Sequence, residues 1–208
     1  IGKNNTSTGG GIVVGSSSSA LGLGIAMGHQ STAAFDGVSI GAGATAGEHA
    51  TAVGSSAFAQ GENSVASGFY SIVTGKSAVG VGAGAVAVAD NAVALGTASL
   101  ASAVDSVALG TNSKADVASG AVGYDPLTKA ASTKTDSTWV STKGAVSVGD
   151  VAGGVTRQIT SVAAGTADTD AVNVAQLKVA AAASDNVGKS TADALGGGAT
   201  YDSVTGNI

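Results

Sequence analysis

The sequence predicts an all-β fold, a parallel β-solenoid made of short stacked coils. Three observations predict it. Glycine recurs at a nearly constant interval, a short aliphatic triplet precedes most of these glycines, and aromatic residues make up only 3% of the chain. The recurring glycines are Gly15, Gly28, Gly41, Gly54, Gly68, Gly82, Gly96 and Gly110, with steps of 13 and then 14 residues. A repeat this short cannot hold a pair of helices, so each repeat is one coil of a stack.

The triplet before each glycine predicts a short strand with two different faces. In Ile25-Ala26-Met27 and Val93-Ala94-Leu95 a small residue stands between two larger aliphatic residues. This period of two is typical of a β-strand. We expect the aliphatic face to fill the interior of the coil and the small face to pack against another chain. The small residues expected at that interface are Ala26, Ser39, Ala52, Ala66, Gly80, Ala94 and Ala108.

A second short strand follows each glycine, and one of its positions varies freely in residue type, as an outward position would. Phe58, Ile72, Val86 and Leu100 occupy this position in four successive coils, with Phe69 and Tyr70 close by. With parallel strands about 4.8 Å apart, these side chains would stack into an apolar stripe. Exposed apolar patches often mark contact surfaces. The stripe is therefore a candidate adhesive surface, with packing inside an oligomer as the alternative.

Composition excludes several classes of protein. A net charge of −5 over 208 residues disfavours nucleic-acid binding. The absence of cysteine excludes disulfides and thiolate metal sites. No apolar run reaches the roughly 20 residues of a membrane-spanning helix. A core of one aliphatic layer against alanine buries little area, at about 25 cal/mol per Å², so we expect an oligomer rather than an isolated monomer.

Residues that could carry chemistry are sparse, and the sequence predicts neither an enzyme nor a cofactor. His29 and His49 stand at different positions of their coils, which favours exposed corner residues over a catalytic pair. The glycines of 22–24 and 80–84 resemble phosphate-binding loops, but no helix with an acidic partner follows them. Five acidic residues are spread singly along the repeats: Asp36, Glu48, Glu62, Asp90 and Asp105. We interpret them as a row of solvated side chains, with a calcium-type site as the alternative.

The repeats, at residues 1–123, end before Tyr124-Asp125-Pro126, and residues 124–167 are interpreted as an interrupted last coil with a neck insertion. Four cations cluster around this insertion: Lys129, Lys134, Lys143 and Arg157. They either keep a loop in contact with water or pair with a neighbouring chain.

The sequence of residues 168–195 predicts a helix with an N-cap at Thr169-Asp170, ended by the glycines of 196–198. Val174, Leu177 and Ala181 follow a heptad-like 3-then-4 spacing.

Residues 166–177, Thr-Ala-Asp-Thr-Asp-Ala-Val-Asn-Val-Ala-Gln-Leu, resemble the neck motif of trimeric autotransporter adhesins. The segments 63–68 and 91–96 resemble the YadA-like head repeats of that family, and 139–149 with 157–159 resembles a neck with an insertion. The resemblance implies a homotrimer of left-handed parallel β-rolls, followed by a neck and a short α-helical coiled-coil stalk. It assigns Arg157, Asp170, Val174 and Leu177 to the neck, and suggests that residues 196–208 begin a further head module.

The same resemblance implies a function. The chain is expected to be the non-catalytic head of a bacterial cell-surface adhesin that attaches to host cells or extracellular matrix by multivalent contacts. The family is held in the outer membrane by a C-terminal anchor, which is not in this sequence. The sequence does not identify the ligand: binding to matrix proteins, binding to glycans and self-association are all compatible with it. The alternative is another class of β-solenoid. Ice binding needs an outward threonine row, hinted at only by Thr32 and Thr45, and a carbohydrate-active rod needs clustered charges.

Overall fold

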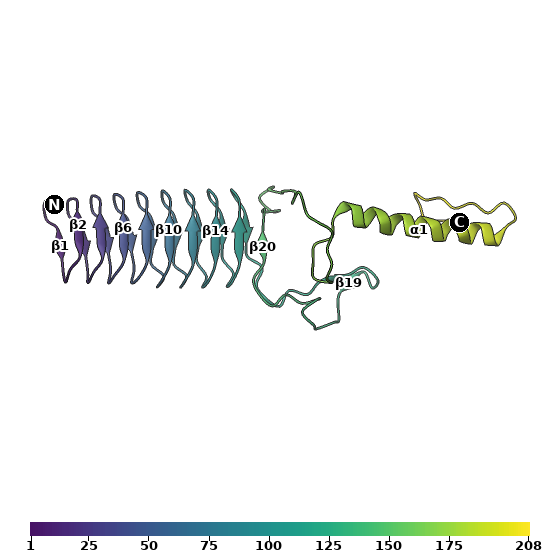
Figure 1. The fold of residues 1–208 in the computed structure, drawn as a ribbon, viewed down its shortest axis with the longest axis horizontal. Helices are drawn as coiled ribbons and strands as arrows, with labels where there is room; N and C mark the ends of the chain where they lie inside the picture. The colour runs from purple at the N-terminus through teal and green to yellow at the C-terminus, as the bar shows by residue number, and fades with distance from the viewer. The chain divides into compact units, whose positions relative to one another are not determined.

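The computed structural model describes residues 1–208, which form two compact units at residues 1–157 and 158–208. The first unit holds two nine-stranded sheets, both parallel, whose strands alternate along the chain and stack coil upon coil (Figure 1). The odd-numbered sheet contains β1 (Thr6–Ser7), β3 (Ser19–Ala20), β5 (Thr32–Ala33), β7 (Thr45–Ala46), β9 (Phe58–Ala59), β11 (Ile72–Val73), β13 (Val86–Ala87), β15 (Leu100–Ala101) and β17 (Lys114–Ala115). The even-numbered sheet contains β2 (Ile12–Val14), β4 (Ile25–Met27), β6 (Val38–Ile40), β8 (Thr51–Val53), β10 (Val65–Ser67), β12 (Val79–Val81), β14 (Val93–Leu95), β16 (Val107–Leu109) and β20 (Val146–Ser147).

The strand register confirms the predicted parallel solenoid. Each strand pairs with the equivalent residues one coil away, as in Val65 with Val79 and Ile72 with Val86. Two corners connect the sheets. The glycine corner leads from an even to an odd strand, and the charged corner leads back. At the glycine corner Gly68 has a φ of +141°, and a Cβ there would overlap the carbonyl group of Gly82 in the next coil. The recurring glycines are therefore required by the close approach of successive coils.

The interior of the coil corrects one prediction. The small residues expected at a chain interface lie instead inside the solenoid, fully buried, and the larger aliphatic residues of the same strands face outward. The inward residues are Ala26, Ser39, Ala52, Ala66, Gly80, Ala94 and Ala108. The two sheets lie so close together that the interior holds almost only alanine and serine. Wider side chains lie outside, apart from Val73, which stands opposite Gly80.

Residues 116–145 leave the solenoid between β17 and β20. The even-numbered sheet resumes at β20, where Val146 pairs with Val107 of β16. Residues 116–145 thus lie outside both nine-stranded sheets, whereas the boundary expected from the sequence is at residue 124. Within this segment, β18 (Tyr124–Asp125) and β19 (Ala130–Ala131) form a two-stranded antiparallel hairpin. Val122, in the last stretch with the repeat pattern, bridges Val140 rather than a neighbouring coil.

The second unit contains the helix α1 (Val174–Leu195). Its N-cap is Asn173 rather than the predicted Thr169-Asp170. The Asn173 side chain accepts a hydrogen bond from the Gln176 amide (3.0 Å), and the Gln176 side chain accepts one from the Asn173 amide (3.3 Å). This reciprocal capping box fixes the start of the helix. None of the chain's helices combines the length and apolar character needed to cross a bilayer.

Candidate functional site

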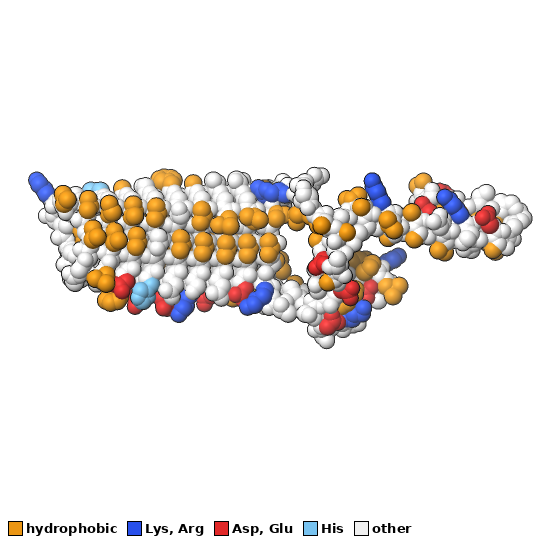
Figure 2. All heavy atoms as spheres, in the orientation of Figure 1, with side chains coloured by type: hydrophobic (Ala, Val, Ile, Leu, Met, Phe, Trp, Pro, Cys, Tyr) orange, Lys and Arg blue, Asp and Glu red, His pale blue; other side chains and the backbone are white.

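The outer side of the even-numbered sheet, which we call the aliphatic face, is lined mainly by apolar side chains. It carries two rows of side chains, from the first and third residues of each strand, visible as two lines in Figure 2. The rows are aliphatic except at Thr51 and Ser67. The first row is half-buried at most positions, and the second is more exposed, with Val81 at 41% and Leu109 at 46%. No charged side chain interrupts either row. The aliphatic face therefore keeps a large apolar area that this chain alone does not cover.

The predicted stripe lies on the other sheet. The register pairs Phe58 with Ile72, Ile72 with Val86, and Val86 with Leu100. The four side chains thus stand in one line on adjacent strands, half-buried or partly exposed. Phe69 and Tyr70 do not belong to this line, because they lie at the glycine corner between β10 and β11.

Most ionic groups of the coils lie at the charged corner. Lys76 Nζ lies 2.7 Å from Glu62 Oε2 one coil away, and the Lys76 amide donates to Asp90 Oδ1 (2.9 Å). The hydrogen bond from Lys76 lowers the pKa of Glu62, and the Lys143 ammonium, 2.8 Å away, is the main cause of a lowered pKa at Asp105. These exposed contacts link successive coils as a solvated row.

The residues with catalytic or metal-binding potential do not converge. His49, at the charged corner, makes an edge-to-face contact with Phe35 at 6.2 Å between ring centroids. His29 lies at the glycine corner, on the other edge of the sheets. No group of three or more histidine, aspartate or glutamate side chains is placed to hold a metal ion.

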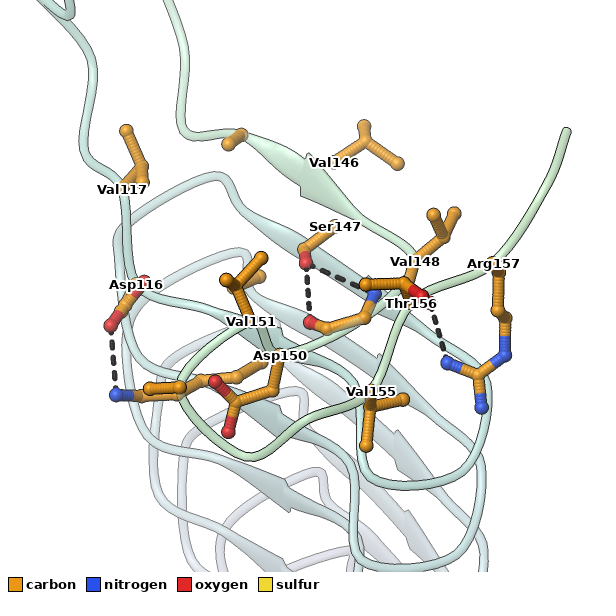
Figure 3. Close-up of a pocket in the computed structure, with 15 residues that line it drawn as sticks. Asp116, Val117, Val146, Ser147, Val148, Asp150, Val151, Val155, Thr156 and Arg157 are labelled. Carbon is orange, nitrogen blue, oxygen red and sulfur yellow. Dashed lines mark hydrogen bonds and ion pairs between the residues drawn. The ribbon is translucent and has the colours of Figure 1, made fainter.

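A cavity of about 590 Å³ lies at the C-terminal end of the solenoid, where no further coil covers the interior (Figure 3). Val146, Val148, Val151 and Val155 supply apolar walls. Its charged lining residues are Lys114, Asp116, Asp150 and Arg157, and Lys114 Nζ lies 2.9 Å from Asp116 Oδ2. The hydrogen bond between them raises the pKa of Lys114 and lowers that of Asp116. The cavity is thus the uncovered end of a repeat structure with one exposed ion pair.

Arg157 closes one edge of this end. Its guanidinium donates to the Thr111 carbonyl (2.6 Å), to Ser113 Oγ (3.0 Å) and to the carbonyl of Val148. It also covers Gly110, where an added Cβ would lie 3.0 Å from Arg157 Cζ. The guanidinium therefore joins the last complete coil to the chain that leaves it, a role that the sequence did not reveal because its partners lie 44 and 46 residues away.

The insertion lysines also find partners inside the chain. Lys143 pairs with Asp105, and Lys134 Nζ stands 4.2 Å above the centroid of the Trp139 ring. With Arg157, these contacts give three of the four predicted cations an intramolecular partner. They hold the insertion and the end of the solenoid in place.

The neck residues of the second unit divide into two kinds. The Asp170 carboxylate accepts hydrogen bonds from the amides of Thr166 (2.9 Å) and Ala167 (3.0 Å), and these donors lower its pKa. Gln176, which sequence reasoning passed over, exchanges two hydrogen bonds of 3.1 Å with the backbone of Gly165. Val174 and Leu177 instead point away from the chain and are mostly exposed. The spacing Asn173-x-x-Gln176 was the available signal for the cap.

Two family models match this architecture and together cover more than half of the chain. The YadA head domain repeat (2 copies) matches residues 46–71, 74–99 and 101–122, within the solenoid. The coiled stalk of trimeric autotransporter adhesin matches residues 158–200, which include α1. The chain belongs to the trimeric autotransporter adhesins.

Two adhesins show sequence similarity to this chain over short stretches. Autotransporter adhesin BadA of Bartonella henselae is 59% identical over 64 residues, and trimeric autotransporter adhesin AtaA of Acinetobacter sp. (strain Tol 5) is 52% identical over 69 residues. Each alignment covers 31% of this chain and 2% of the relative, so the match concerns a small part of either adhesin. The crystal structure of the collagen-binding domain of Yersinia adhesin YadA is 28% identical in sequence, and the match covers 86% of this chain and 72% of that one with a TM-score of 0.38.

Proposed function

We propose that three copies of this chain associate through their aliphatic faces. The interior of one solenoid buries mainly alanine and serine, and Val73 is its largest fully buried side chain. Most of the apolar area that could stabilise the fold therefore lies outside, on the aliphatic face. At roughly 25 cal/mol per Å² of apolar surface removed from water, covering that face contributes stability that the interior cannot. Val174 and Leu177 of α1 are also mostly exposed. Packed against the same residues of two other chains, they would form the apolar seam of a coiled coil.

The trimer acts as a non-catalytic adhesive head at a bacterial cell surface. Stacked coils repeat similar outer surfaces at a fixed spacing, and three copies present each surface three times. Weak contacts then combine, because linked sites bind the same target at a high effective concentration. The line of Phe58, Ile72, Val86 and Leu100 is a candidate contact surface, since it lies on the sheet that the proposed trimer leaves open. The observation that carries the proposal is an uncharged aliphatic face on a solenoid with an alanine interior.

Bead attachment tests the adhesive function. Beads carrying the 208-residue chain are applied to surfaces coated separately with collagen, fibronectin and laminin, and to host cells. A matched variant, Val81→Lys/Leu109→Lys, places charges in the proposed interface and is loaded at the same chain density. We expect the unaltered chain to attach to at least one surface and the variant to lose attachment by about 10²-fold, through lost avidity. Failure of the unaltered chain to attach to any surface contradicts the adhesive function.

A further inference from the structure

One pair of aromatic residues stands out at the glycine corner. Phe69 and Tyr70 are 57% and 56% exposed, and their rings meet edge to face with centroids 4.5 Å apart. They lie between β10 and β11, in the middle of the solenoid. Edge-to-face packing fixes the two rings relative to each other while leaving much of their surface in water. The pair is thus a preformed aromatic surface rather than part of the core.

The backbone at Tyr70 does not favour a tyrosine. Its φ is +53°, in the left-handed region, where a bulky residue is a conformational outlier. Every equivalent corner position has positive φ, and the other coils place smaller or more flexible residues there: Asn4, Ser17, Gln30, Gly43, Ser56, Gly84, Ala98 and Asn112. Because the ring is more than half exposed, burial does not compensate for this conformation. Such strain is characteristic of functional positions, and it points to a contact outside the chain.

Short side chains flank the pair along the corner. Ser55 and Ser56 occupy the same two positions one coil before, and Ala83 and Gly84 occupy them one coil after. With coils about 4.8 Å apart, these residues leave open space on both sides of the rings. A flat group of ring size can therefore lie beside the aromatic pair.

The chemistry of the corner restricts what that group is. Most formal charges of the coils lie at the charged corner. The charged or basic side chains at the glycine corner are far from the aromatic pair: Lys3 and His29 stand five and three coils before Phe69, and Arg157 covers Gly110 three coils after it. The corner thus offers no strong partner to an anionic or cationic ligand. Backbone pairing with a peptide is also limited, because the Tyr70 amide donates to the Ser55 carbonyl (3.1 Å) and the Phe69 carbonyl accepts from the Gly84 amide (2.8 Å). What the pair presents is ring surface and the phenol hydroxyl of Tyr70.

Ring surface beside hydroxyl groups suits a neutral sugar, whose pyranose C–H groups pack on an aromatic face while its hydroxyls bond at the rim. We propose that Phe69 and Tyr70 form a binding site for a neutral carbohydrate chain, with one pyranose ring stacked on the pair. This proposal rests on the adhesive function and names the class of ligand. In the trimer the site is present three times, so weak stacking at each copy gains from multivalency.

Saturation-transfer NMR tests the site with defined probes. Aromatic protons of the full chain are saturated in the presence of maltohexaose, laminarihexaose or chitohexaose, and transfer to the sugar is recorded. We expect transfer to at least one hexasaccharide, and at least a tenfold loss of affinity in both Tyr70→Gly and Phe69→Ser. The matched control is Phe35→Ser, which removes an aromatic ring of similar exposure at the charged corner and leaves binding unchanged. Absence of transfer to all three sugars, or transfer that persists in Phe69→Ser/Tyr70→Gly, overturns the proposal.

Tyr70→Gly also separates a binding role from a structural one. Glycine adopts the +53° conformation without strain, so a binding tyrosine predicts an unchanged or higher melting temperature and an unchanged sedimentation coefficient. A lower melting temperature or a dissociated oligomer means that the ring packs within the assembly, and the proposal fails. The bead assay is run on the same variants. Attachment without sugar binding leaves the adhesive function standing and removes only the carbohydrate site, whereas loss of all attachment by the unaltered chain removes the adhesive function itself.

Discussion

Gly80 and Val73 face each other inside the solenoid, where both differ from the alanine that most coils place at these positions. In neighbouring coils the two positions hold alanine, as in Ala87 and Ala94. A Cβ added to Gly80 would lie 2.6 Å from Val73 Cγ2. The larger valine on one sheet is thus matched by the missing methyl on the other. At the scale of single residues, the coil interior tolerates almost no change of volume.

A double-mutant cycle at this pair measures that restriction. Gly80→Ala forces a methyl group against Val73 and should destabilise the fold by about 1–3 kcal/mol through overpacking. Val73→Ala leaves a void and should cost roughly 1–3 kcal/mol. The double variant restores the alanine pair of the other coils, so its loss should be clearly smaller than the sum of the two single losses. Chemical denaturation followed by circular dichroism gives the three values, and strict additivity would contradict the contact.

Ala94→Gly is the control for this cycle. It removes a methyl group one coil further on, opposite Ala87, where no clash needs relief. The variant should only lose stability, from lost packing and a more flexible unfolded chain. A gain of stability would show that the interior is overpacked generally, rather than only beside Val73.

At the scale of elements, the end of the solenoid depends on Arg157. The guanidinium bonds to the carbonyls of Thr111 and Val148 and to Ser113 Oγ, so it ties the outgoing chain to the last coil. Arg157→Ala should cost about 1–2 kcal/mol, since hydrogen bonds from a charged donor exceed neutral ones and the site is exposed. Arg157→Lys keeps the charge but not the planar fork, and should recover only part of the loss.

Hydrogen exchange locates this effect. In Arg157→Ala, the amides of Ser113 and Lys114 should exchange faster, while amides of the first coils keep their protection. Equal loss of protection along the whole solenoid would contradict a local end cap, because a repeat protein couples each coil mainly to its neighbours.

The elements differ in how far the sequence predicts them. The glycine interval and the aliphatic triplets predict the strands, their parallel register and the insertion into one coil. The alternation in Ile25-Ala26-Met27 shows that a strand has two faces, but not which face is inside. That choice depends on the distance between the two sheets, which no single strand encodes, and the prediction of an aliphatic interior was wrong for this reason. The Arg157 contacts also escaped prediction, because they join residues 44 and 46 positions apart that nothing in the local pattern connects.

The sequence predicts the neck only in part. Asp170 was assigned from the resemblance, and the structure gives it the backbone donors of Thr166 and Ala167. The true helix start at Asn173 was readable from its spacing to Gln176, a capping box. The competing Thr169-Asp170 pair offered an equally good cap by residue type. The contact of Gln176 with the backbone of Gly165 also favours Asn173 as the cap.

At the scale of the whole molecule, the outward aliphatic rows become the basis of assembly. A chain whose interior is alanine has its larger aliphatic groups available for a partner, and a second copy offers the same uncharged surface. The charged corner, by contrast, already holds ion pairs and solvated acids, so it suits the water-facing side of an assembly. The distribution of side chains around one coil thus predicts which substitutions separate the chains and which do not.

Two double variants test this distribution, because the side chains that they replace are similarly exposed in the single chain. Val81→Lys/Leu109→Lys alters side chains that are 41% and 46% exposed on the aliphatic face, and Val88→Lys/Val104→Lys alters side chains that are 43% and 54% exposed at the charged corner. Burying an unpaired ammonium group is strongly unfavourable, so the first variant should sediment as a monomer with a lower melting temperature, and the second as a trimer. Both variants keep their Lys side chains in water if the chain is a monomer, and then neither changes the sedimentation coefficient. A trimer in both variants would instead place the interface on another surface and remove the aliphatic face from the assembly.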